Sequence, residues 1–169
     1  MLRLRPYKAC DAAVIVSWSE DEAAFRRWSA DRFPTYPITA EDLNRHYGDM
    51  AESDSFYEFT AFDDTGVVGH LIMRFTDKEK TILRFGFIIV DPRKRGRGYG
   101  REMLKLASRY AFDCLKVETI TLGVFENNMS AYRCYRAAGF RETLSQEESW
   151  YHIVNEDWKC IEMALTKDG

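Results

Sequence analysis

The chain has 169 residues, 46% of them hydrophobic and 14% aromatic, which is enough for one domain with a sizeable core. A net charge of −3 gives no overall reason to expect a nucleic-acid-binding protein. No apolar run approaches the roughly 18 residues of a membrane span, and the first residues lack the pattern of a secretory leader. We therefore expect one domain over residues 1–169, located in the cytoplasm, with no nucleic-acid or membrane partner.

The cysteines and histidines are scattered along the chain. The four cysteines form no Cys-x-x-Cys pair, which in a chain of this size is typical of free thiols in a reducing compartment. The three histidines, His46, His70 and His152, lie far apart and have no metal-ligand spacing. The sequence therefore predicts no metal site.

The first half of the chain predicts strands and helices in turn. Residues 2–7 alternate apolar and polar positions, as in a short strand, and two helices are expected between residues 11 and 29. Thr39, followed three residues later by Asp42, resembles a capping box and predicts the start of another helix. Residues 56–76 predict a hairpin around an Asp-Asp-Thr-Gly turn. Residues 81–90 predict a further strand with alternating apolar residues at Leu83, Phe85, Phe87 and Ile89.

The second half predicts a long helix, a strand, a short helix and a last strand. Apolar residues recur at helical spacing from Met103 to Leu115. A strand is expected at residues 119–125, and a helix at residues 130–138 that ends at Gly139 in a left-handed cap. The segment 158–166 alternates like a strand. This order of elements predicts a mixed α/β sheet.

The segment "DPRKRGRGYGREML" (residues 91–104) joins a predicted strand to the long helix. Amide groups in the first turn of a helix have no intrahelical partners, and the helix dipole is positive there. Glycines let a ligand approach the backbone closely, and arginines suit phosphate oxygens. The segment therefore predicts a pyrophosphate site at Arg95, Gly96, Arg97, Gly98, Tyr99, Gly100 and Arg101. A solvated glycine-rich turn is the alternative.

Two common nucleotide-binding motifs do not fit this segment. The P-loop requires a Gly-Lys-Ser/Thr end, which the sequence lacks, and the Rossmann pattern requires a further glycine after Gly100. A nucleotide-binding protein that uses the same loop is therefore disfavoured.

A second segment, "ENNMSAYRCYRAAGF" (residues 126–140), follows the strand after the long helix. Together the two segments resemble the paired motifs of the GCN5-related N-acetyltransferase (GNAT) superfamily. The first motif, R/Q-x-x-G-x-G/A, matches Arg95, Gly98 and Gly100. The second, N-x-x-A-x-x-x-Y-x-x-x-G-F, matches Asn128, Ala131, Tyr135, Gly139 and Phe140. Looser features, including the aromatic late segment 150–165, resemble the branch of ribosomal-protein alanine acetyltransferases.

The resemblance implies a GNAT fold: one α/β (α+β) domain with a mixed, mostly antiparallel sheet of about six or seven strands, flanking helices and a splayed central strand pair. It also implies direct acetyl transfer from acetyl-CoA to a primary amine of a small molecule or a protein N-terminus, and a possible homodimer. By the same resemblance, the backbone at Ile88, Ile89 and Val90 pairs with the pantetheine arm, and an N–H there polarises the thioester carbonyl.

Side-chain roles follow from the same resemblance. Tyr135 is expected to protonate the departing thiolate as the general acid, with Tyr132 as the second choice. Asn128 is expected to hydrogen-bond the pantetheine, unless it serves as a helix-entry residue. The general base is less defined, because the strand before the glycines holds Arg84 and no acid. Glu58, or a water molecule, is the predicted base.

The missing strand acid leaves an alternative open, a catalytically degenerate module that binds CoA without turnover. The acceptor cannot be named from the sequence, but Trp18, Trp28, Tyr36 and Tyr57 are predicted to line its pocket, unless they belong to the core.

Overall fold

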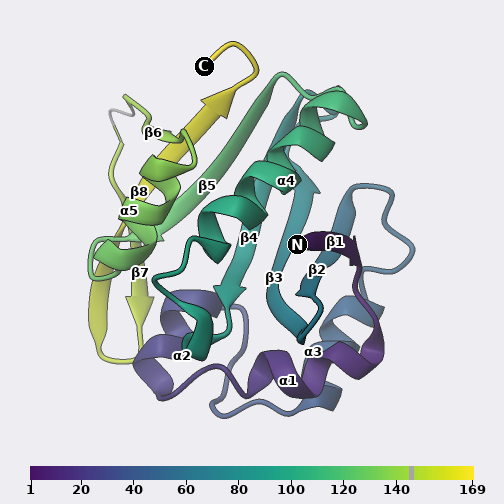
Figure 1. Cartoon of the computed structure of the whole chain (residues 1–169). Helices are drawn as coiled ribbons and strands as arrows, with labels where there is room; N and C mark the ends of the chain where they lie inside the picture. Colours follow the sequence, from purple (N-terminus) through teal and green to yellow (C-terminus); the bar gives the residue numbers. More distant parts are fainter. Residues whose placement is uncertain (145–146) are drawn as a thin grey trace.

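The computed structural model describes residues 1–144 and 147–169 of the chain. Its helices and strands follow one another in the order that Figure 1 shows. The elements are β1 (Arg3–Pro6), α1 (Ala12–Val16), α2 (Glu22–Ser29), α3 (Ala40–Gly48), β2 (Phe56–Asp63), β3 (Gly66–Phe75), β4 (Ile82–Val90), α4 (Tyr99–Asp113), β5 (Thr119–Phe125), α5 (Met129–Ala137), β6 (Arg141–Glu142), β7 (Ser149–Ile153) and β8 (Glu156–Thr166).

The strands form one eight-stranded sheet in the order β1-β2-β3-β4-β5-β8-β6, with β7 paired to β8. The β4–β5 pair is parallel and the other strand pairs in the described part of the chain are antiparallel, so the mixed, mostly antiparallel sheet is confirmed. The described part of the chain has eight strands where six or seven were expected, because β6 and β7 were not among the elements predicted from the sequence. The signal for β7 was present as the run Trp150, Tyr151 and Ile153 before a turn at Val154, where φ is +58°.

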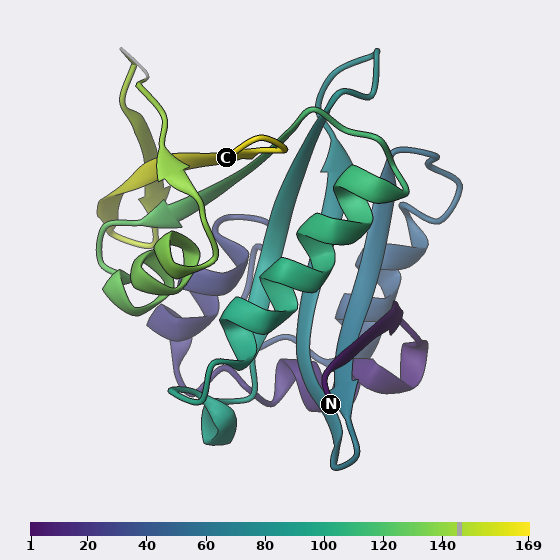
Figure 2. The same ribbon diagram turned by 45° about the horizontal axis from the view of Figure 1, so that its top comes forward.

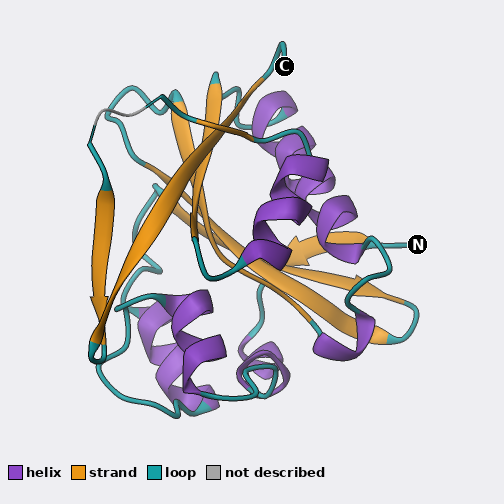
Figure 3. Cartoon of the chain, turned by 90° about the vertical axis from the view of Figure 1, so that its left-hand side faces the viewer, coloured by secondary structure: helices purple, strands orange, loops and turns teal. Residues whose placement is uncertain are grey.

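Two hydrophobic clusters lie on opposite faces of this sheet. Helices cover both faces (Figure 3). One face is covered by α4 and α5. Met103, Leu104 and Ala107 of α4 pack in one cluster with Phe85 of β4. The other is covered by the short helices α1 to α3, around Leu43 and several aromatic residues that include Phe25. Burial of these apolar surfaces is the main stabilising term of the fold.

Helix ends follow the predicted local chemistry. Thr39 and Asp42 form the predicted capping box at the start of α3, each side chain accepting a hydrogen bond from the other residue's backbone N–H. At the end of α5, Gly139 has φ +107°, the left-handed position that the sequence predicted for it. No helix in the described part of the chain is both long and apolar enough to cross a bilayer.

Candidate active site

The parallel strands β4 and β5 are paired at one end and separate at the other. The paired residues are 82–84 of β4 and 119–121 of β5, and no pairing continues beyond Arg84 and Thr121. Figure 2 shows the strands joined at one end and apart at the other. This splay was expected from the family resemblance. It leaves the backbone of residues 86–90 and 123–125 unpaired on the sides that face each other.

A β-bulge at Phe87 changes the face of the sheet toward which the alternate side chains of β4 point. Phe87 has φ +48°, and the register with β3 shifts between His70 and Ile72. Before the bulge, Phe85 belongs to the cluster beneath α4, whereas Phe87 and Ile89 belong to the cluster beneath α1 to α3. The alternation read from the sequence as one apolar face is therefore divided between two cores. A left-handed conformation is costly for a residue with a bulky side chain and is often found at functional sites.

The glycine loop, residues 95–101, ends at α4, on the α4-covered side of the splay (Figure 1). Gly96 and Gly98 have φ +74° and +85°, and an added Cβ at either position would meet no atom within 4 Å. The amides of residues 96–98 donate to no acceptor in the described part of the chain, and residues 99–101 form the first turn of the helix. The loop therefore offers open space and free N–H groups to an anion.

Two groups of basic residues lie in this segment. Arg93 binds Asp91 with two contacts, and Lys94 lies 3.3 Å from Asp63 on the β2–β3 hairpin. Arg95, Arg97 and Arg101 are exposed and pair with no acidic residue that the structure describes. The three arginines that match or flank the motif are therefore available to a ligand, whereas the other two basic side chains hold the loop in place.

Tyr99 also holds the loop in place. Its hydroxyl donates to Asp63 at 2.8 Å, and hydrogen bonds from Thr65 and Tyr99 lower the pKa of the Asp63 carboxyl. The hydroxyl is thus turned to the hairpin, and the backbone N–H of Tyr99 is the group left for a ligand.

Tyr135 lies on α5 and is buried, with 7% of its surface exposed. Its hydroxyl has no hydrogen-bond partner among the described residues. The pKa of the phenol is raised, mainly by burial and further by the nearby Cys134 and Cys160. Cys160 of β8 pairs with Phe125 at the open end of β5. Tyr135 is therefore a protonated, unpartnered donor close to the splay.

The other predicted residues of α5 have partners within the chain. Asn128 is the N-cap residue, and its side-chain oxygen accepts from the N–H of Ala131 at 3.4 Å. The Tyr132 hydroxyl donates to Glu142 of β6. The helix-entry role that was the alternative for Asn128 is thus present, and its side-chain N–H₂ group is left for a ligand.

A cavity of about 660 Å³ opens on the face of the sheet covered by α2 and α3. It reaches the splay, because Gly86 and Phe87 of β4 and Gly123 and Phe125 of β5 line it. Of the aromatic residues predicted for an acceptor pocket, Trp28 lines the cavity, whereas Trp18, Tyr36 and Tyr57 pack elsewhere in the two clusters. A cavity of this size fits a small-molecule ligand.

The model of the acetyltransferase (GNAT) family matches residues 22–140, more than half of the chain. The chain belongs to this family. It is an acyltransferase that uses acetyl-CoA to N-acetylate a primary amine, as the paired motifs implied.

Relatives of this acetyltransferase include enzymes named for polyamines. Spermidine N(1)-acetyltransferase of Vibrio cholerae is 24% identical over 141 residues, covering 83% of this chain and 79% of that one. A crystal structure of the Vibrio cholerae spermidine N-acetyltransferase in complex with CoA and spermine has a TM-score of 0.83 at 20% identity, covering 99% of this chain and 96% of that one. The acetyltransferase PseH of Campylobacter jejuni is 23% identical over 126 residues, covering 75% and 76%. The resemblance to ribosomal-protein alanine acetyltransferases is not confirmed by these relatives.

The cavity of the acetyltransferase also contains residues that the sequence analysis did not assign to the site. Glu162 of β8 accepts from Arg84 of β4 at 2.7 and 3.1 Å, and both line the cavity. Arg74, which lies directly opposite Arg84 in the β3–β4 pair, lines it as well. An arginine within each of the two largely apolar strands β3 and β4 was the signal that could have found Arg74 and Arg84.

Two titratable side chains, Glu58 and His46, are candidates for the general base. Glu58 lies half-buried on β2, burial raises the pKa of its carboxyl, and it does not line the cavity. His46 of α3 does line it, in contact with Phe33 and Phe87 at ring-centroid distances of 5.0 and 5.7 Å. The pKa of the His46 imidazole is lowered, mainly by burial and also by the positive charge of Arg32. The negative charge of Asp49 acts in the opposite direction and raises it.

No group of three or more His, Cys, Asp or Glu residues in the described ranges is arranged to hold a metal ion. The four cysteines are free thiols.

Proposed function

We propose that the acceptor is a small-molecule primary amine that binds in the 660 Å³ cavity and meets the acetyl group at the splay. The observation that most supports this acceptor site is that the cavity is continuous with the splay between β4 and β5. An amine can then approach from the face covered by α2 and α3, while acetyl-CoA binds from the face covered by α4 and α5. The two substrates meet without an acetylated enzyme residue, which agrees with direct transfer.

The glycine loop fits the pyrophosphate of CoA. Its free N–H groups, the helix dipole of α4 and the exposed side chains of Arg95, Arg97 and Arg101 all favour a di-anion. In this arrangement Ile88, Ile89 and Val90 offer backbone groups to the pantetheine arm. Asn128 offers its amide N–H₂ group at the entry to α5.

In the reaction, the amine nitrogen attacks the thioester carbonyl carbon, a C–N bond forms and the C–S bond breaks. The carbonyl oxygen gains negative charge, and a backbone N–H directed into the splay by the bulge at Phe87 stabilises it. The thiolate leaves with the bonding electrons and takes a proton from Tyr135. Because burial raises the pKa of Tyr135, the phenol is protonated at neutral pH and able to donate.

The amine must lose a proton before or during attack. We place this role on His46, acting directly or through a water molecule, because it lines the cavity and its lowered pKa keeps the imidazole neutral at pH 7. Glu58 stays the sequence-based prediction for this role, and it lies on the same side of the sheet, near Tyr7 and Tyr47.

The relatives support a small acceptor more than a protein N-terminus, since two of those reported above are named for polyamines. Self-association is a prediction for this chain, supported by one neighbour described as a dodecameric spermidine N-acetyltransferase.

The test is release of the CoA thiol, followed with a thiol reagent, across a panel of primary amines, with mass spectrometry to identify the acetylated amine. Turnover well above the rate without amine is expected for at least one small amine. Tight acetyl-CoA binding with no turnover for any acceptor would instead support the degenerate CoA-binding module.

A further inference from the structure

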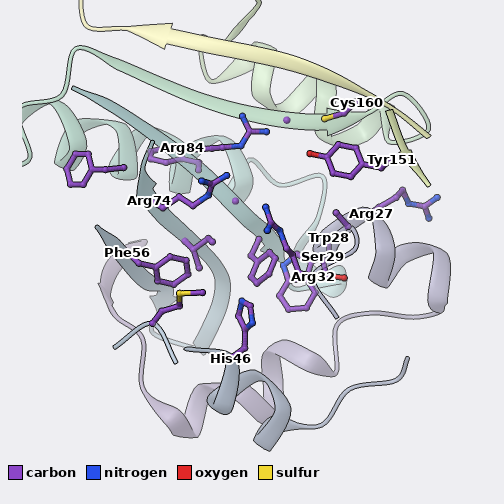
Figure 4. A pocket seen from close by; sticks show the side chains of 18 of the residues that line it. Arg27, Trp28, Ser29, Arg32, His46, Phe56, Arg74, Arg84, Tyr151 and Cys160 are labelled. Atoms are coloured by element: carbon purple, nitrogen blue, oxygen red, sulfur yellow. The ribbon is translucent and has the colours of Figure 1, made fainter. Parts of the chain in front are cut away.

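The cavity carries more positive charge than its acidic residues balance. Its lining includes Arg27, Arg32, Arg74 and Arg84, and Glu162 is its one carboxylate among the residues that the structure describes. Glu162 binds Arg84 through both carboxylate oxygens and so neutralises that guanidinium. Figure 4 shows the side chains of Arg32, Arg74 and Arg84 around the interior of the cavity.

Arg74 and Arg84 occupy directly opposed positions of an antiparallel strand pair. Like charges at such positions repel each other and destabilise the pairing. Glu162 reduces this repulsion by binding Arg84, but Arg74 itself has no hydrogen bond or ion pair with any described residue. The positive charges of Arg84 and Arg32 therefore still act on Arg74, without a carboxylate bound to it.

The pKa of Arg74 reflects this environment. It is lowered first by burial and then by the charges of Arg84 and Arg32, while Tyr151 and Glu162 oppose the effect weakly. A guanidinium that is half-buried beside two others, with no carboxylate of its own, is a costly arrangement for the free protein. An anion between Arg32 and Arg74 would remove that cost.

We infer that the acceptor of this acetyltransferase is an amine that also carries a carboxylate or phosphate group, and that Arg32 and Arg74 bind this anionic group. The inference rests on the proposed function, because it names the chemical class of the amine that binds in the same cavity. Guanidinium groups present paired N–H donors that match both carboxylate and phosphate oxygens. The amine end of such a molecule then points to the splay.

The same charges act against a polyamine. Spermidine and spermine carry several positive charges at neutral pH, and none of the lining residues except Glu162 offers a counter-charge. That carboxylate is already bound to Arg84. The aromatic side chains of Trp28, Phe56 and Phe125 give the cavity an apolar part of its wall, which suits the uncharged part of an amine that has one anionic end.

The first experiment compares kcat/KM for four amines at one ionic strength. They are spermidine as a polycation, phenethylamine as a neutral-tailed amine, 4-aminobutyrate as a carboxylate and phosphoethanolamine as a phosphate. We expect at least one of the two anionic amines to exceed both others by about 10²-fold or more, and the better one identifies carboxylate or phosphate as the preferred group. Highest turnover with spermidine or phenethylamine would overturn the inference while leaving the proposed function intact.

The second experiment uses variants. Arg74→Gln and Arg32→Gln should each raise the KM for the preferred anionic amine at least 10-fold, with a smaller change for phenethylamine. Arg109→Gln, an exposed residue of α4 outside the cavity, removes the same charge and should leave both values unchanged. Equal losses for the anionic and the neutral amine in the Arg74 variant would show a structural role for Arg74 and overturn the inference.

A binding measurement separates the two proposals. Calorimetry of the CoA-loaded protein with phosphoethanolamine and 4-aminobutyrate reports on the anion subsite whether or not transfer takes place. Binding that Arg74→Gln abolishes, combined with no turnover of any amine, would refute the proposed function and support the subsite. Absence of binding to wild type for both anionic amines would refute the subsite.

Discussion

Gly98 allows the assignment of the glycine loop to be tested with two almost isosteric variants, Gly98→Asp and Gly98→Asn. A Cβ at this position meets no atom within 4 Å, so neither variant causes a steric clash. The backbone has φ +85°, which Asn and Asp tolerate better than other residues with side chains. The conformational cost is about 1 kcal/mol for both variants, or roughly 2–4 °C in Tm for a chain of this size.

The binding of acetyl-CoA should separate the variants. Asp places a negative charge between the free amides and the arginines, where the pyrophosphate is expected. Two unit charges about 5 Å apart repel by about 3 kcal/mol at an effective dielectric constant of about 20. Gly98→Asp should therefore bind acetyl-CoA roughly 10²-fold more weakly than Gly98→Asn, and the ratio should fall as salt is added.

Isothermal titration calorimetry gives the two dissociation constants for acetyl-CoA. Thermal unfolding without ligand shows whether the two substitutions lower the stability of the protein equally. If Gly98→Asp binds acetyl-CoA within a few-fold of Gly98→Asn while both are folded, the pyrophosphate does not bind at this loop. If the Asp variant is much less stable than the Asn variant, the carboxylate disturbs the free loop and the charge argument is wrong.

Two further predictions concern proton transfer. Tyr135→Phe keeps the packing of the ring and removes the hydroxyl, so kcat should fall by roughly 10²-fold with little change in the KM for acetyl-CoA. If kcat is unchanged under conditions where the chemical step limits the rate, Tyr135 is a packing residue. For His46, the base must be neutral, so wild-type kcat/KM should fall as pH drops through a pKa below the ordinary value of about 6.5. His46→Gln should lower kcat and remove this acid limb, whereas the exposed His152→Gln should retain it, and an unchanged limb in His46→Gln would transfer the role to another group.

The motif residues could be predicted because they are close together in sequence and their chemistry is local. The glycine loop and the left-handed Gly139 depend on backbone conformations that glycine permits, and the capping box follows from Thr39 and Asp42, three residues apart. These features can be read without knowledge of which elements meet in space. They were sufficient for the family and the fold.

The acceptor side could not be predicted in the same way. Arg74, Arg84 and Glu162 come from three strands and meet because of a specific register, which the sequence does not give. The bulge at Phe87 is also invisible in a two-residue alternation, because the pattern of apolar residues is the same with and without it. His46 was not considered for the general base for a related reason, since it reaches the cavity through the packing of α3 against the sheet.

The splay has a consequence for hydration and for association with other chains. Where β4 and β5 separate, each presents backbone donors and acceptors as an edge strand does, but inside the sheet instead of at its rim. Exposed edges invite pairing with the strands of other molecules, and these two are protected by their short length and by the side chains of the neighbouring helices. The amides of β4 and β5 that face the splay should exchange with solvent far faster than those of the central strand β3, which is paired on both sides.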